Sequence, residues 1–455
     1  MKPFARITPR LRSILSVSLI TLAIVAASWI SAAATRSSPA SDLSDDVLAG
    51  AVERAGASTD RLIEQLQARL KSAPDNWQAY SQLGVAYLQK ARETGDPAYY
   101  PKIESVLHKA LALQPGDYVA TAALGALELA RHQFRSALEW GERARQINPQ
   151  RAYAYGVVVD AQVELGRYDE AVETLQAMVD LRPDLSSYSR ISYLRELHGD
   201  LDGAIEAMHW AVEAGGPKAE NTHWTRVQLG HLYFQTGRLD QAEAQYRLAL
   251  AADPGYVHAL AGLARVRAAR SDYEAAIQAY SDVVKRMPLP EYVIALGDVY
   301  EAAGRSAEAQ QQFDLARAIE RLYRANGVDT DLEMALFEAD HAGADRLDEA
   351  LARARRAFEQ RRTIYAADVL AWTLHQSGQH AEAYAMSRQA LRLGTQDALV
   401  LFHAGMIAYR AGRAAEAQAH LERALAVNPN FSLRYRDAAR STLEALRQSA
   451  MIDNH

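Results

Sequence analysis

The sequence predicts an all-α solenoid of about ten two-helix units, closed at its C-terminus by a capping helix. A frame of residues recurs about 34 positions apart: a small pair, often Leu-Gly, then a bulky residue, Gly, Ala and Pro. Such a period is typical of stacked helical hairpins. Strong helix formers fill nearly every segment, and no stretch shows the sustained alternation of a half-buried strand. All three observations favour helices over a sheet.

Composition excludes several classes of function. The 455 residues contain no cysteine, so disulfides, zinc fingers, iron–sulfur clusters and thiol catalysis are excluded. The net charge is −6, with basic and acidic residues interspersed. Because no basic stripe accompanies the aromatic residues, we expect no nucleic-acid partner.

Residues 1–34 have the character of a targeting segment. Four cations precede an uncharged run from Ser13 to Ala34, and that run is long enough to span a bilayer as a helix. The charge bias keeps the N-terminus in the cytoplasm and sends the rest across the membrane. Ala32-Ala33-Ala34 fits a cleaved signal peptide, whereas the length of the run fits an uncleaved signal-anchor, and a buried core helix is a third reading. The first two place the chain on the periplasmic side of the inner membrane, where the anchor would also hold it to the membrane.

The remaining elements follow in order. Residues 35–57 are small, polar and acidic, which predicts a flexible linker. An amphipathic helix over 58–73 follows, with Ser58 and Thr59 as candidate caps, and is expected to cover the first unit. Residues 74–315 contain units one to seven, and the stretch 91–101 is expected to lengthen the internal turn of unit one by about seven residues.

The frame then becomes irregular over 316–362. The second helix of unit seven is expected to continue to Asn326, and an eighth unit is recognisable only from Leu347 and a few alanines. The frame returns in units nine and ten over 363–430. A capping helix and tail occupy 431–455, because the end of a repeat array needs a polar outer face.

Each recurring residue has a packing reason. Gly230 and Gly405, inside first helices, are expected to let the second helix approach the backbone. Gly237, like the glycines at the hairpin turns of other units, should adopt the left-handed conformation that ends a helix. The bulky residue of the second helix, Tyr246 in unit five, should reach the neighbouring unit. Proline, as at Pro254, stops the second helix.

With these residues in phase from Trp77 to Pro429, the chain resembles the tetratricopeptide repeat family, in its bacterial exported or membrane-anchored type. The resemblance implies antiparallel helix pairs wound into a right-handed superhelix with a concave inner wall. It also implies non-enzymatic recognition of a protein or peptide partner. Inner positions hold mostly apolar and acidic residues, so the Lys/Arg/Asn clamp that some relatives use for a C-terminal carboxylate is not expected.

Spacing around the small residue of each first helix predicts which side chains face inward. Two aromatic clusters result, on either side of a more polar middle that also contains Asp298 and Glu301. Aromatic residues are favoured at interfaces, although each ring could instead pack between adjacent helices. The candidate groove residues are Tyr153, Asp160, Tyr193, Trp224, His231, Phe234, Arg265, Tyr365, Trp372, His375, Phe402, Met406 and Tyr409.

No catalytic, cofactor or metal motif is evident. The sequence has no H-E-x-x-H, P-loop or G-x-S-x-G pattern. His375 and His380 are five residues apart, which fits one helical face poorly. The acidic stretch 198–203 is better explained by a helix-capping turn than by a calcium loop. We therefore expect no cofactor, no metal and no enzyme activity.

Three functions stay open at this point. The first is an extracytoplasmic scaffold or adaptor whose groove binds a protein or peptide, in the assembly or maturation of an envelope or exported complex. The second is an accessory subunit that presents substrate to a separate enzyme. The third is an enzyme with its site in the irregular segment 316–362, which contains no candidate nucleophile–base pair.

Overall fold

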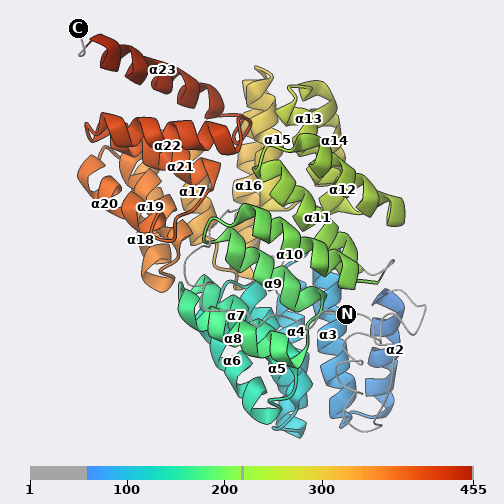
Figure 1. Cartoon of the computed structure of the whole chain (residues 1–455). Helices are drawn as coiled ribbons and strands as arrows, with labels where there is room; N and C mark the ends of the chain where they lie inside the picture. Colours follow the sequence, from blue (N-terminus) through green and yellow to red (C-terminus); the bar gives the residue numbers. More distant parts are fainter. Residues whose placement is uncertain (1–58, 217–219, 342, 453–455) are drawn as a thin grey trace.

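The computed structural model describes residues 59–216, 220–341 and 343–452. All regular structure within those ranges is helical, in 22 helices labelled α2 to α23 (Figure 1). The predicted leader 1–34 and linker 35–57 lie outside the described residues. Among the helices that are described, none has the length and apolar character needed to cross a membrane.

Ten consecutive helix hairpins make up most of the chain, which is the predicted all-α solenoid. Each hairpin packs most extensively within itself and then against its neighbours in sequence. Helix α2, Thr59–Ser72, covers the first unit, and α23, Arg436–Ile452, follows the last. The pairs between them are α3 Trp77–Thr94 with α4 Tyr99–Leu113, α5 Tyr118–Ala130 with α6 Phe134–Ile147, α7 Ala152–Glu164 with α8 Tyr168–Leu181, α9 Leu185–Glu196 with α10 Leu201–Ala214, α11 Glu220–Gln235 with α12 Leu239–Ala252, α13 Val257–Ala269 with α14 Tyr273–Arg286, α15 Pro290–Ala302 with α16 Ser306–Ala325, α17 Asp331–His341 with α18 Ala344–Gln360, α19 Ile364–Gln376 with α20 His380–Ala390, and α21 Ala398–Arg410 with α22 Ala414–Val427.

Two regions differ in detail from the predicted pattern. The insertion in unit one mostly extends α3, which runs to Thr94 and ends at a left-handed Gly95, so that only a short turn connects it to α4. The irregular segment contains the expected extension of α16 to Ala325, followed by a helix hairpin, α17–α18. That hairpin has no left-handed glycine at its turn, since Gly343 has φ −72°. Gly343 therefore does not form the left-handed turn seen at the glycines of most other hairpins.

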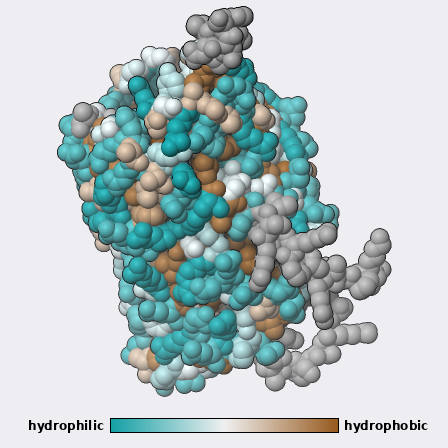
Figure 2. Space-filling model, turned by 60° about the vertical axis from the view of Figure 1, so that its left-hand side comes forward, coloured by the Kyte–Doolittle hydropathy of each residue, from teal (hydrophilic) through white to brown (hydrophobic). Residues whose placement is uncertain are grey.

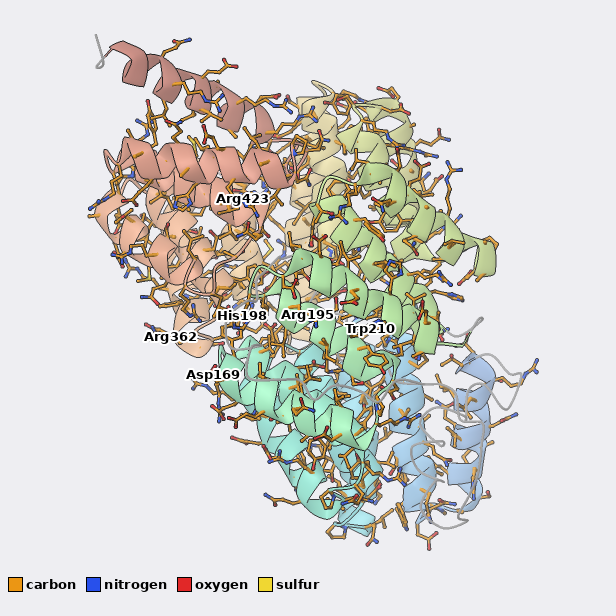
Figure 3. All side chains as sticks on the ribbon, viewed as in Figure 1. Asp169, Arg195, His198, Trp210, Arg362 and Arg423 are labelled. Carbon is orange, nitrogen blue, oxygen red and sulfur yellow. The ribbon has the colours of Figure 1, made fainter. Side chains whose placement is uncertain are left out.

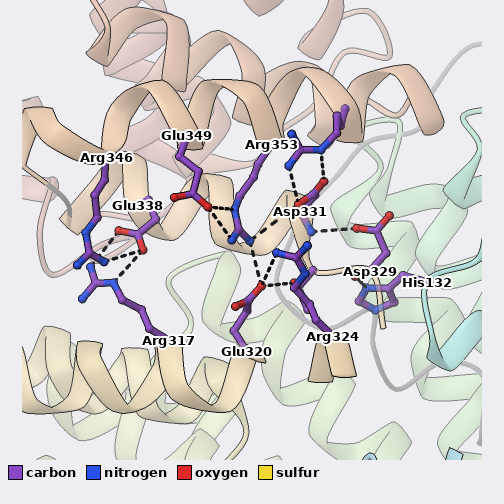
Figure 4. Close-up of polar contacts among 12 residues, drawn as sticks. His132, Arg317, Glu320, Arg324, Asp329, Asp331, Glu338, Arg346, Glu349 and Arg353 are labelled. Carbon is purple, nitrogen blue, oxygen red and sulfur yellow. Dashed lines mark hydrogen bonds and ion pairs between the residues drawn. The ribbon is translucent and has the colours of Figure 1, made fainter. Parts of the chain in front are cut away.

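Charged residues hold this eighth unit together (Figure 4). On α16, Arg317 lies 2.8 Å from Glu338 of α17, and Glu320 lies 3.0 Å from Arg353 of α18. Glu320, Glu338 and Arg353 are all buried. Removing one partner of a buried pair leaves an uncompensated charge, so these pairs tie the three helices in one arrangement.

The helix glycines make room for a bulky side chain of the second helix. A Cβ on Gly230 would lie 2.4 Å from the Tyr246 ring, and one on Gly262 of the next unit would lie 2.6 Å from it. Tyr246 is fully buried between the two glycines. A Cβ on Gly405 would likewise lie 2.8 Å from Leu421. The expected close approach of the second helix at Gly230 and Gly405 is confirmed, and a bulky side chain of that helix occupies the space beside each glycine.

The glycines at the hairpin turns have the predicted left-handed conformation. Gly166 has φ +76° and Gly378 has φ +75°, and Gly237, Gly304 and Gly412 are similar. In units two and six the same turn is made by His132 at φ +59° and Ser271 at φ +62°. Residues with a Cβ are strained there by roughly 1–2 kcal/mol.

We therefore expect Ser271→Gly to stabilise the protein. Glycine relieves the left-handed strain, while its greater freedom in the unfolded chain offsets part of the gain. The expected net effect is about 0.5–1 kcal/mol in the free energy of unfolding, measured by denaturant titration. An unchanged or lower stability would show that the Ser271 hydroxyl, 3.4 Å from Arg436, contributes more than the strain costs.

The solenoid closes on itself, so that hairpin turns of its first half meet connecting turns of its second half. The contacting residues are separated by a nearly constant distance in sequence, which corresponds to one superhelical turn. We call this line of contact the seam. Its hydrogen bonds join His132 Nδ1 to the carbonyl of Asp329 at 2.8 Å and 197 residues apart, the Ile364 N–H to Tyr168 at 3.1 Å and 196 apart, and the Asn428 amide to the carbonyl of Phe234 at 2.9 Å and 194 apart.

The turn glycines that lie at the seam have close neighbours on the next superhelical turn, and the other turn glycines do not. A Cβ on Gly166 would lie 2.4 Å from the carbonyl oxygen of Arg362, which Figure 3 labels near His198. Cβ atoms on Gly95 and Gly237 would also approach residues of the second superhelical turn, Leu289 and Pro429. At Gly304, Gly378 and Gly412, by contrast, no described atom would lie within 4 Å. The first set of turns is covered by the next superhelical turn, and the second set is open.

Candidate partner-binding surface

The C-terminal aromatic cluster joins units nine and ten to the segment before α23. Trp372 of α19 stacks on His403 of α21, with ring centroids 4.1 Å apart. Phe402 stacks on Tyr435 at 4.9 Å and contacts Phe431 at 5.5 Å. Tyr435 and Phe431 belong to the chain's own closing segment. Part of the predicted groove is therefore filled by the protein itself.

Hydrogen bonds to two acidic side chains hold this aromatic cluster in place. The Trp372 indole and the Tyr435 hydroxyl both donate to the same oxygen of Asp340, each at 2.8 Å. His403 is completely buried, and its Nδ1 lies 2.9 Å from Asp368. Burial opposes a charge on His403, but the neighbouring Asp368 carboxylate raises its pKa above the usual value. The Trp372 indole N–H and His403 Nδ1 are both paired inside the protein, so these two side chains have a packing role.

The predicted groove residues divide by exposure. Six of them are buried: Asp160, Trp224, Phe234, Tyr365, Trp372 and Phe402. Another six are partly exposed: Tyr153, Tyr193, His231, Arg265, His375 and Met406. Tyr409 is 40% exposed. At the C-terminal cluster, the half-buried Leu399 and Met406 and the exposed Tyr409 lie on α21, and we call these three residues the rim.

The N-terminal aromatic cluster lies mainly within the fold. The Arg265 guanidinium lies over the Phe234 ring, 4.0 Å from the ring centroid, in a cation–π contact. His231 Nδ1 pairs with the hydroxyl of Tyr246 at 2.8 Å. The carbonyl of Phe234 accepts the seam hydrogen bond from Asn428. Superhelical closure thus brings the hairpin turn of unit five against the end of unit ten, which spacing along the sequence did not indicate.

The acidic candidate in unit three is paired. Asp160 accepts from Arg190 of unit four at 2.8 Å through Oδ1 and again through Oδ2, and both side chains are buried. Arg190 was not among the predicted residues. The sequence signal that could have identified Arg190 is a basic residue 30 positions after Asp160, about one repeat further along the chain. This bidentate pair joins two first helices and leaves little of Asp160 for a partner.

An outer patch was also missed. Trp210 of α10 is 37% exposed, lies 5.9 Å from Tyr188, and has the Arg195 guanidinium 5.9 Å from its ring (Figure 3). The face of the molecule in Figure 2 is mainly hydrophilic, with apolar residues gathered in patches among the polar ones. A single exposed tryptophan on a second helix gives no periodic signal, which is why inner-wall spacing could not find it.

Four partly buried histidines predict acid sensitivity. Burial lowers the pKa of His231 to about 3 and the pKa values of His198, His258 and His375 to about 4. At pH values between these folded-state pKa values and the pKa of about 6.5 in the unfolded chain, the unfolded chain binds more protons than the folded protein. Stability therefore falls as the pH decreases through this range. For one such group we expect a loss of about 2 kcal/mol between pH 7 and pH 5.

Urea titrations of the wild type and His231→Gln at pH 7.5, 6 and 5 measure this effect. The variant should lose less stability than the wild type on acidification, whatever its stability at pH 7.5. An identical pH dependence in the two proteins would contradict the assignment to His231.

Three tetratricopeptide repeat models match the chain, at residues 128–195, 227–289 and 398–431. The chain is 30% identical over 213 residues to cellulose synthase 1 operon protein C of Komagataeibacter xylinus, covering 44% of this chain and 15% of that protein. It is 25% identical over 186 residues to the TPR repeat-containing protein YpiA of Bacillus subtilis, covering 40% and 43%. The matches thus span less than half the length of either relative.

Two solved structures are similar in part. A thermophilic TPR protein of Thermus thermophilus has a TM-score of 0.37 and 24% identity, covering 44% of this chain and 99% of that one. The human IFIT1 dimer has a TM-score of 0.46 and 15% identity, covering 83% and 89%.

The stacked hairpins and their glycine–bulky-residue packing define a helical-repeat scaffold protein. Repeats of this class generally mediate binding between proteins, and the fold is generally non-catalytic. Because three family models match within these helix hairpins, the chain contains tetratricopeptide repeats over the matched residues.

Proposed function

We propose that this protein is an extracytoplasmic scaffold that binds a protein or peptide partner at the rim of its C-terminal aromatic cluster, in the assembly or maturation of an envelope or exported complex. One observation carries the proposal. Tyr409 stays 40% exposed beside the half-buried Met406, whereas the rings beneath them are held by internal contacts. An amphipathic aromatic side chain on a rigid base loses little entropy when it is covered.

The rim suits an apolar segment of a partner. Leu399, Met406 and Tyr409 lie on one helix, α21, in a row that an extended or helical peptide can follow. Methionine adapts to irregular partner surfaces. The buried base keeps the row in place, since Phe402 on the same helix is fixed by Tyr435.

Site-specific cross-linking tests the rim. A photoreactive residue at position 409 should capture one protein, which is then identified by mass spectrometry and purified. The purified partner should bind the wild type and bind Tyr409→Ala about tenfold more weakly. A photoreactive residue at Leu248, which is 48% exposed on a second helix, is the matched control and should capture nothing specific. Failure to capture from position 409 in a folded protein would refute the rim as the binding site.

Location is tested separately. The leader 1–34 supports export through its charge bias and apolar run. N-terminal sequencing of the protein from fractionated cells should find it in the periplasmic or membrane fraction, beginning after residue 34 for a cleaved signal or retaining residues 13–34 for an anchor. Recovery of the full-length chain in the cytoplasm would contradict export.

An accessory subunit is the second candidate, favoured by one comparison. The Komagataeibacter relative, which matches this chain over 213 residues, is named as a protein of a cellulose synthase operon. If the captured partner is an enzyme, its activity should increase when this chain is added, and Tyr409→Ala should reduce the increase. Binding without any change in activity would favour the scaffold.

A further inference from the structure

Three metal-ligating side chains meet between units seven and eight. Asp298 and Glu301 lie one turn apart on α15, and His341 is the last residue of α17. One ligand atom from each residue lies within 4.8 Å of the other two. This is the polar middle of the predicted groove, where the sequence placed Asp298 and Glu301, but His341 was not foreseen there.

His341 is held in one orientation. Its side chain is only 4% exposed, and its ring lies 4.3 Å from the Phe313 ring and 5.0 Å from the Phe337 ring. Nδ1 lies 2.9 Å from the backbone carbonyl of Phe337, and Nε2 lies 2.7 Å from Asp298. Both ring nitrogens therefore face an oxygen that, as a carbonyl or a carboxylate, can only accept a hydrogen bond.

A neutral imidazole cannot satisfy both contacts. It carries one N–H and one lone pair, so either tautomer would direct a lone pair at an oxygen acceptor. Both contacts become favourable only when a cation occupies the space at Nε2, with the Nδ1–H donating to Phe337. That cation is either a proton or a metal ion.

The remaining groups favour a metal ion. A metal-binding histidine commonly donates its other ring N–H to a backbone carbonyl, as His341 can. Asp298 and Glu301 each supply a negatively charged oxygen that can bind a cation. Arg434 contacts Glu301 through Oε2, and so leaves Oε1 for a ligand bond. One imidazole and two carboxylates form a donor set that suits Zn²⁺.

We propose that Asp298, Glu301 and His341 bind a divalent transition-metal ion of the Zn²⁺ type. This site goes beyond the partner-binding function and differs from the sequence-based expectation of no metal. The ion would connect α15 of unit seven to α17 of unit eight. Through Glu301 and Arg434 it would also fix the closing segment that carries Tyr435.

Zinc titration of the full-length chain tests the proposal. After treatment with EDTA and its removal, calorimetric titration with ZnCl₂ should show one Zn²⁺ bound per chain. Glu301→Gln and His341→Gln should each weaken binding by at least about tenfold. Glu301 is exposed, so its variant is expected to fold, and circular dichroism checks this. Glu308→Gln is the matched control, because Glu308 lies nearby in sequence and pairs with Arg305 instead.

The outcomes separate metal from proton. Tight 1:1 binding that both site variants weaken and Glu308→Gln leaves unchanged supports the site. No heat of binding with Zn²⁺, or binding that Glu301→Gln does not weaken, overturns it and leaves a protonated His341 beside Asp298. Equal weakening by Glu308→Gln would indicate nonspecific binding to surface carboxylates and would also overturn it.

Discussion

Gly166→Val is expected to open the seam and to destabilise the protein strongly. A Cβ at this position would lie 2.4 Å from the carbonyl oxygen and 2.7 Å from the carbonyl carbon of Arg362, on the next superhelical turn. Backbone cannot rotate away as a side chain can, so the two turns must separate or both must distort. Valine also strains the left-handed turn, where φ is +76°, because a β-branched residue is an outlier in that region. We expect the overlap alone to cost about 1–3 kcal/mol.

Gly378→Val is the control that isolates the seam. Gly378 makes the same kind of turn in unit nine at φ +75°, and no described atom would lie within 4 Å of its Cβ. Both variants carry the same backbone strain, so the difference between their unfolding midpoints measures the contact between superhelical turns. Small-angle scattering should show a larger radius of gyration for Gly166→Val only. Equal midpoints and equal scattering for the two variants would contradict the closed superhelix.

Trp372→Ala is expected to cause the largest loss of stability among the predicted groove residues. The side chain is 3% exposed, stacks on His403 and donates to Asp340. Deleting a buried aromatic side chain typically costs about 3–5 kcal/mol, because it removes contacts and leaves a cavity. Asp340 also loses one of its two donors. The measurement is the free energy of unfolding by denaturant titration.

Tyr409→Ala separates packing from partner binding within the same cluster. The Tyr409 side chain is among the exposed large hydrophobic groups, at 40% exposure. We therefore expect its removal to change stability by about 0.5 kcal/mol or less, as is usual for surface substitutions, and to weaken partner binding instead. If Trp372→Ala were as stable as Tyr409→Ala, the internal role of Trp372 would be wrong. The tryptophan would then belong to the binding surface, as the spacing alone suggested.

The hairpins could be predicted from sequence because their signals are local. The left-handed conformation of Gly237 and the fit of Tyr246 against Gly230 depend on residues of the same unit. The eighth unit was harder to predict, since buried ion pairs such as Glu320–Arg353 join it to α16 and its turn lacks a left-handed glycine. Charged pairs between helices leave no periodic pattern in one sequence.

The candidate site was predictable only in part. Spacing selected Phe402 and Tyr409 as inner-wall residues, but it could not indicate that Tyr435 covers the first and leaves the second exposed. It also placed Asp298 in the groove without His341, because His341 reaches Asp298 from a different unit, 43 residues away.

The repeat, its helix pairs and the residues that pack within each pair follow from the sequence alone, because each depends on neighbours within about one period. The closure of the superhelix was decided by the tertiary structure. Small rotations between successive units add up before Asn428 meets Phe234, from which it is separated by 194 residues. A slight change in any of those rotations would separate the two turns, so no local pattern encodes the seam, the covered half of the groove or the cluster at His341.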